Sequence, residues 1–69
     1  MHMYNVIEVI EGVVKNDDMI DGVQLGMLID DFYEVYMRVG KKRDCFIKWG
    51  GDCMVEIQFD AVCNYKIFN

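Results

Sequence analysis

The sequence predicts a small α+β domain in which two helices precede a three-stranded antiparallel sheet. Apolar residues recur at helical spacing over residues 5–16 and 24–39, and they alternate at strand spacing in the second half of the chain. The strands are expected at about 44–49, 53–59 and 63–68, joined as a meander, with both helices on one sheet face. A chain of 69 residues suffices for one domain with a thin core.

The first expected helix rests on conflicting signals. Strand is favoured by six β-branched residues, namely Val6, Ile7, Val9, Ile10, Val13 and Val14. Their spacing, however, places them on one helical face opposite Glu8 and Glu11, whereas a strand would have no clean polar face. Asn5 and Glu8 also match a capping-box start. We therefore expect a helix over residues 5–16, with a strand as the open alternative.

The second expected helix has a clearer pattern, after an Asp-rich connection over residues 16–22. Its apolar positions are Leu25, Leu28, Ile29, Phe32, Val35, Tyr36 and Val39. Charged side chains lie on the opposite face, with Glu34 and Arg38 in the favoured i,i+4 order. Gly40 is expected to end this helix, before a basic run at residues 41–43.

The register of the three strands follows from which residues must share a face. A three-residue loop after Trp49 pairs Trp49 with Cys53, Ile47 with Val55 and Cys45 with Ile57, which keeps apolar residues together. A further loop at residues 60–62 places Cys63, Tyr65 and Ile67 on that same face.

The composition leaves little for catalysis, so we expect no enzyme, no cofactor and no metal site. The chain has no Ser or Thr, and its one histidine is His2. The cysteines Cys45, Cys53 and Cys63 form no Cys-x-x-Cys pair, and the expected register opposes none of them to another. They are expected to be buried thiols, which indicates a reducing cytoplasmic environment.

The charge is unevenly distributed and predicts a protein partner. Residues 1–34 hold eight acids against one lysine, whereas residues 35–69 carry a net charge of +2. Carboxylates one helical turn apart are spaced like successive phosphates, about 6 Å. We therefore expect a non-enzymatic inhibitor or modulator that imitates nucleic acid and binds the basic surface of a host nucleic-acid-handling or defence protein. The expected contact residues are Asp17, Asp18, Asp21, Asp30, Asp31 and Glu34.

Two alternatives remain open. One is a small nucleic-acid-binding regulator, whose contacts would be Arg38, Lys41, Lys42, Arg43 and Lys48. The acidic front half makes direct nucleic-acid binding the less favoured reading. The other is a homodimeric structural module that associates through exposed aromatic and Met side chains. In the favoured reading, Met27, Tyr33 and Met37 on the flanks of the acidic helix add apolar contacts to the partner interface.

The ends and composition carry further expectations. Met1-His2 is typical of a cloning remnant, so the natural chain is compatible with a start at Met3. No apolar run reaches the roughly 18–20 residues of a membrane span. A short acidic chain rich in Ile, Asn, Asp, Lys and Met, with no Pro, is typical of phage and mobile-element accessory proteins acting in the host cytoplasm.

Overall fold

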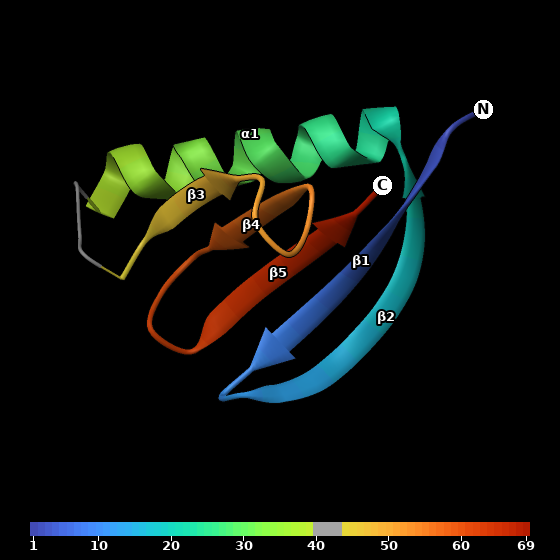
Figure 1. Cartoon of the computed structure of the whole chain (residues 1–69). Helices are drawn as coiled ribbons and strands as arrows, with labels where there is room; N and C mark the ends of the chain where they lie inside the picture. The colour runs from blue at the N-terminus through green and yellow to red at the C-terminus, as the bar shows by residue number, and fades with distance from the viewer. Residues whose placement is uncertain (40–43) are drawn as a thin grey trace.

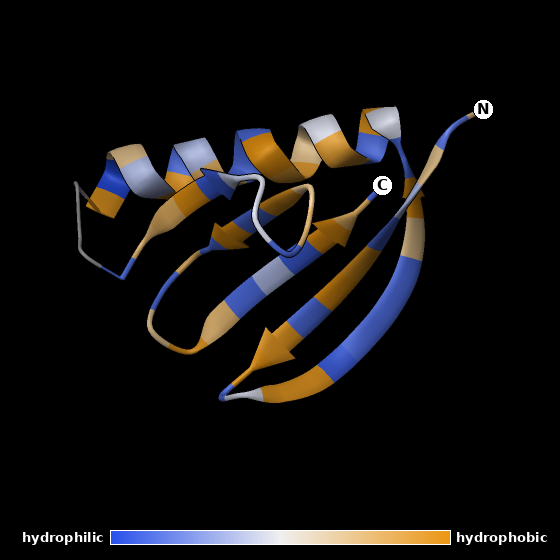
Figure 2. Ribbon diagram, in the orientation of Figure 1, coloured by the Kyte–Doolittle hydropathy of each residue, from blue (hydrophilic) through white to orange (hydrophobic). Residues whose placement is uncertain are grey.

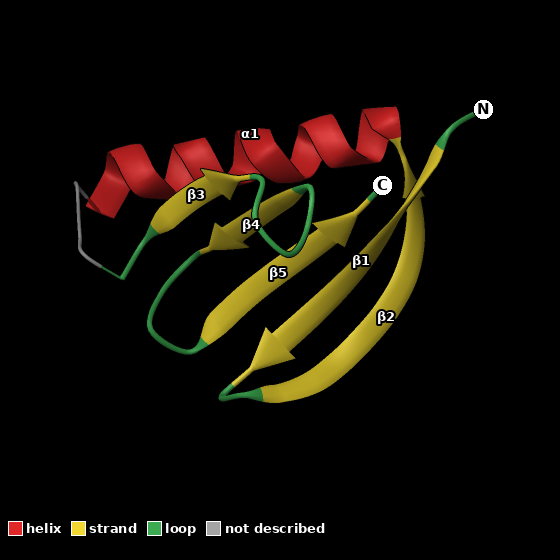
Figure 3. Cartoon of the chain, in the orientation of Figure 1, coloured by secondary structure: helices red, strands yellow, loops and turns green. Residues whose placement is uncertain are grey.

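The computed structural model describes residues 1–39 and 44–69, and there it holds one helix and one five-stranded antiparallel sheet (Figures 1 and 3). The elements are β1 Met3–Ile10, β2 Val13–Asp21, α1 Gly22–Val39, β3 Phe46–Trp49, β4 Val55–Gln58 and β5 Cys63–Phe68. The sheet order is β2-β1-β5-β4-β3, and α1 lies along one face (Figure 1). The expected architecture of two helices and a three-stranded meander is therefore wrong; the fold is mostly β.

The expected first helix and the Asp-rich connection are instead the β1–β2 hairpin. Glu11 and Gly12 form its turn with φ of 52° and 77°. Two successive positive φ values match the twist of a two-residue hairpin turn. The expected capping box does not form, because the Asn5 side chain bonds to Asp17 across the hairpin and Glu8 bonds to Asn16 and Tyr65.

The helix expected over residues 5–16 is wrong because β1 is an inner strand with apolar side chains on both faces, a pattern that resembles helical spacing. Val6 points toward α1 and is buried, whereas Ile7 and Val9 point to the face that α1 leaves open and are half-buried. The apolar/polar alternation of a one-sided strand is therefore missing. The β-branched content of this segment was the correct signal.

The hairpin pairing contains one irregularity. Glu8 opposes Asn16 but Val9 opposes Val14, so Lys15 is an extra residue in β2, as in a β-bulge. The expected connection over residues 16–22 is wrong because this acidic segment is mostly strand. The middle of β2 is hydrophilic (Figure 2), and because β2 is an edge strand, Asp17 and Asp18 remain exposed there.

Helix α1 confirms the expected helix at 24–39 and begins slightly earlier. Leu25 and Phe32 are buried against the sheet, and Leu28, Ile29 and Tyr36 pack around them. Over the residues described, no helix combines the length and the apolar character that crossing a bilayer requires.

The β3–β4 pairing differs from the expected register by two residues. Trp49 opposes Val55 and Ile47 opposes Ile57, so residues 50–54 form the loop. A slip of two keeps every side chain on its face, so the apolar pattern could not distinguish the two registers. Gly50 and Gly51 have φ of 86° and 87°, and Gly50 N–H donates to Met54 O at 2.8 Å. The loop conformation therefore requires the two glycines.

Strand β5 matches the expected strand, and its register with β4 is the expected one. Val55 opposes Ile67, Ile57 opposes Tyr65, and Phe59 N–H donates to Cys63 O at 3.0 Å. Side chains of β1, α1, β4 and β5, with Cys45 just before β3, form a core of Val6, Leu25, Phe32, Cys45, Val55, Ile57 and Ile67.

Of the three cysteines, Cys45 and Cys53 are buried, whereas Cys63 is half-buried. Cys53 lies in the β3–β4 loop rather than opposite Trp49, and its thiol donates to Val55 O at 3.4 Å. The expectation of three buried thiols is therefore right for two of them.

Candidate functional site

The structure divides the six expected acidic contact residues between the edge strand β2 and the outer side of α1. Asp17 and Asp18 are exposed at the middle of β2, where successive side chains point to opposite sheet faces. Asp17 accepts a hydrogen bond from Asn5 Nδ2 at 2.6 Å, which holds it on the face away from α1. The six carboxylates therefore do not form one row.

Asp21 has a structural role at the junction of β2 and α1. Its carboxylate accepts a hydrogen bond from Gln24 N–H at 2.8 Å, and the Gln24 side-chain oxygen accepts one from Asp21 N–H at 3.0 Å. These reciprocal bonds form a capping box, which satisfies backbone donors that a helix start leaves free. The spacing of Asp21 and Gln24 in the sequence carries this signal, whereas the expected box at Asn5 and Glu8 does not form.

The outer side of α1 holds the other three acids together with apolar side chains. Val23, Met27, Asp30, Glu34 and Met37 recur at alternating steps of four and three, which places them in one stripe opposite the buried face. The exposed fractions of Val23, Met27 and Met37 are 74%, 62% and 78%. Asp31 lies beside the stripe, and none of these carboxylates forms an ion pair with another described residue. We call Val23, Met27, Asp30, Glu34 and Met37 the outer stripe.

The structure does not bring the described basic residues together. Arg38 is exposed in the last turn of α1, on the face of the sheet that the helix covers. Lys48 is exposed on β3, and its side chain lies on the opposite face, since Ile47 and Trp49 are the β3 residues on the helix side. Lys41, Lys42 and Arg43 lie outside the described residues.

A polar cluster that the sequence analysis missed links three strands on the helix side. The Glu8 carboxylate accepts hydrogen bonds from Tyr65 Oη at 2.6 Å and Asn16 Nδ2 at 2.5 Å. These bonds, the one from Tyr65 foremost, lower the pKa of Glu8. Burial, followed by the bond to Glu8, raises the pKa of Tyr65. Burial also raises the pKa of the adjacent Cys63 thiol, which makes it a poor nucleophile.

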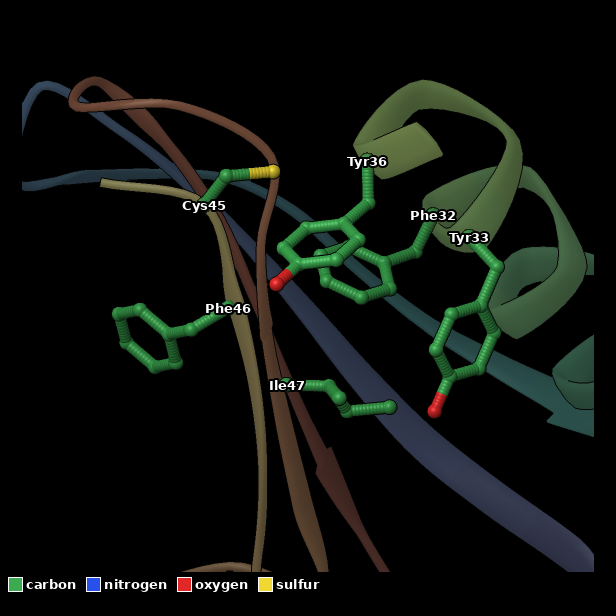
Figure 4. A pocket seen from close by; sticks show the side chains of 6 residues that line it. All are labelled: Phe32, Tyr33, Tyr36, Cys45, Phe46 and Ile47. Atoms are coloured by element: carbon green, nitrogen blue, oxygen red, sulfur yellow. The ribbon is translucent and has the colours of Figure 1, made fainter. Parts of the chain in front are cut away.

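A pocket lies between α1 and the edge strand β3 (Figure 4). Its volume is about 250 Å³, and it is lined by Phe32, Tyr33, Tyr36, Cys45, Phe46 and Ile47. Phe32 forms the floor, with ring centroids 5.3 Å from Tyr33 and 5.7 Å from Tyr36. Cys45 and Ile47 point toward the helix, whereas Phe46 points away (Figure 4).

Neither a metal site nor a catalytic cluster emerges from the described residues. No three of their His, Cys, Asp and Glu side chains gather closely enough to hold a metal ion. The outer stripe of α1 and the pocket beside β3 both have the character of binding surfaces.

Comparison with known proteins adds no assignment. No protein-family model, curated protein or solved structure shows significant similarity to this chain.

Proposed function

We propose that this protein is a non-enzymatic protein-binding modulator whose outer stripe binds a partner with a basic surface. The observation that carries the proposal is the stripe itself: three strongly exposed apolar side chains flank the carboxylates of Asp30 and Glu34. The fold does not need these side chains, because α1 packs on the sheet through its opposite face. Exposed methionines beside charges provide adaptable apolar contact together with electrostatic steering.

The charge of the stripe favours a different partner over a second copy of this chain. Two copies that associated through their stripes would bring Asp30 and Glu34 of each near those of the other, and like charges at an interface oppose association. A partner surface rich in Lys and Arg would instead pair with them. Such surfaces are common on proteins that bind nucleic acid, so the partner we favour is a nucleic-acid-handling protein of the host cell.

A charge reversal tests this proposal. The variant D30K/E34K should weaken partner binding by at least about tenfold, equivalent to ~1.4 kcal/mol, because two attractive contacts become repulsive. The measurement is capture of the partner from host-cell extract by immobilised protein, followed by titration calorimetry with the purified partner. Binding should weaken as salt rises, and nucleic acid should compete with it.

The matched control is E11K/D52K, which changes the net charge equally. Glu11 lies in the β1–β2 turn and Asp52 in the β3–β4 loop; both are exposed and neither belongs to the outer stripe. Equal loss of binding in both variants would show that only net charge matters and would contradict the proposal. Salt-sensitive binding of DNA or RNA by the protein itself would favour the regulator alternative instead.

A further inference from the structure

Strand β3 ends the sheet and leaves one side of its backbone without a partner strand among the described residues. Glu56 and Gln58 of β4 oppose Lys48 and Phe46. Along an antiparallel strand, the backbone N–H and C=O groups of successive residues point alternately to one neighbouring side and the other. The bond from Phe59 N–H to Cys63 O shows that Phe59 points to β5, and the bond from Gly50 N–H to Met54 O shows that Gly50 points to β4. The backbone groups of Phe46 and Lys48 therefore point to β4, and those of Ile47 and Trp49 point outward.

The pocket lies beside this free edge. Ile47, whose N–H and C=O point outward, also contributes its side chain to the pocket wall (Figure 4). An additional strand paired with Ile47 would place the opposing side chain on the helix side, next to Tyr33 and Tyr36. The volume of about 250 Å³ is below the range of sites for drug-sized ligands and suits one large side chain.

The other face of β3 indicates the charge of the added strand. Lys48, Glu56 and Lys66 oppose one another in a row across β3, β4 and β5. This row alternates in sign and ends with the exposed Lys48 at the free edge. An acidic side chain opposite Lys48 would continue the alternation, which is the favourable arrangement for cross-strand pairs.

We propose that an extended peptide segment of a partner protein adds to the free edge of β3 as an antiparallel strand, with an acidic residue opposite Lys48 and the following aromatic or leucine side chain in the pocket. The main-chain bonds to Ile47 and Trp49 hold the segment, and the pocket and Lys48 select its sequence. This inference does not rest on the proposed function, because the outer stripe shares no residue with the pocket.

The test uses the blocked hexapeptide TVEFVT, whose glutamate and phenylalanine take the two specified positions. The peptide should shift the backbone amide resonances of Ile47 and Trp49 saturably and change the fluorescence of Trp49, the single tryptophan, which is 60% exposed. N-methylation of the phenylalanine removes the donor to Ile47 and should weaken binding about tenfold. N-methylation of the glutamate, whose N–H points away from β3, is the matched control.

A charge exchange tests the selection. K48E should bind TVEFVT several-fold more weakly and should bind TVKFVT more tightly than the unchanged protein does; Lys48 is exposed, so the fold should be retained. Equal effects of the two N-methyl groups, resonance shifts confined to other strands, or no binding at millimolar peptide would overturn the proposal. Amide shifts at Ile47 and Trp49 that depend on protein concentration without peptide would assign the edge to a second copy, which also overturns it.

Discussion

At the scale of single residues, the bond between Glu8 and Tyr65 is the contact most open to measurement. It joins the inner strand β1 to β5, the central strand of the sheet. Tyr65→Phe should lower the free energy of unfolding by about 1 kcal/mol, because it removes a hydrogen bond to a charged group that is only partly shielded from water. Chemical denaturation at neutral pH measures the loss. Tyr33→Phe, at a side chain that is 46% exposed, is the control and should change stability little.

The same contact predicts a pH dependence. The pKa of Glu8 is lowered in the folded state from its ordinary value of 4.5. The unfolded chain therefore binds the proton more readily, so the contribution of Glu8 is present above pH 4.5 and is lost as pH falls through the lower folded-state pKa. Glu8→Gln should make stability fall less steeply on acidification than in the unchanged protein. If the free energy of unfolding of the two proteins fell equally steeply on acidification, this assignment would be contradicted.

At the scale of elements, the start of α1 separates two roles of Asp21. If the carboxylate acts as a helix cap, Asp21→Ala should cost about 1 kcal/mol of stability, whereas Asp21→Asn should cost little because the amide oxygen still accepts from Gln24 N–H. Thermal unfolding of the two variants checks this difference. Equal destabilisation by both would show that the charge matters rather than the capping bond.

The elements also show how far sequence reasoning reaches in this chain. Helix α1 was predictable because its two faces differ strongly in polarity, and β5 was predictable because its register depended on a short loop. The β1–β2 hairpin was not predicted, because apolar side chains on both faces of β1 imitate helical spacing. For the β3–β4 loop, the sequence predicted the correct sheet face for each side chain but a loop two residues too short. Faces repeat every two residues, so the apolar pattern does not distinguish the two lengths.

Some features of the candidate sites could also be predicted from the sequence, and others depend on the fold. The acidic face of α1 could be expected from spacing alone, and the exposed methionines beside it could too. The pocket beside β3 could not, because it depends on how the helix packs beside the edge strand in three dimensions. The spacing of Asp21 and Gln24 carries the capping signal, but it lies where a connection was expected, and the structure assigns it with the helix start at Gly22.

At the scale of the whole molecule, stability depends on a small set of buried side chains. Val55, Ile57 and Ile67 are each 0% exposed, and Phe32 is 1% exposed. Ile67→Ala should cost about 2–5 kcal/mol, a large share of the stability of a domain this small. Loss of the cooperative thermal transition, or a large fall in its midpoint, is the expected result. Val62→Ala, at a side chain that is 47% exposed, is the control and should leave the transition near that of the unchanged protein.

The pairing of β1 with β5 has a consequence for synthesis of the protein. Residues 5–10 pair with β2 on one side, but their partners on the other side are residues 63–68. The β1–β2 hairpin and the β3–β4 pair therefore remain unjoined until β5 has left the ribosome. A chain stalled before that point exposes Val6 and the apolar face of α1 to solvent together. Chaperone binding to such stalled chains should therefore persist until β5 emerges and then end abruptly, as the last strand closes the sheet.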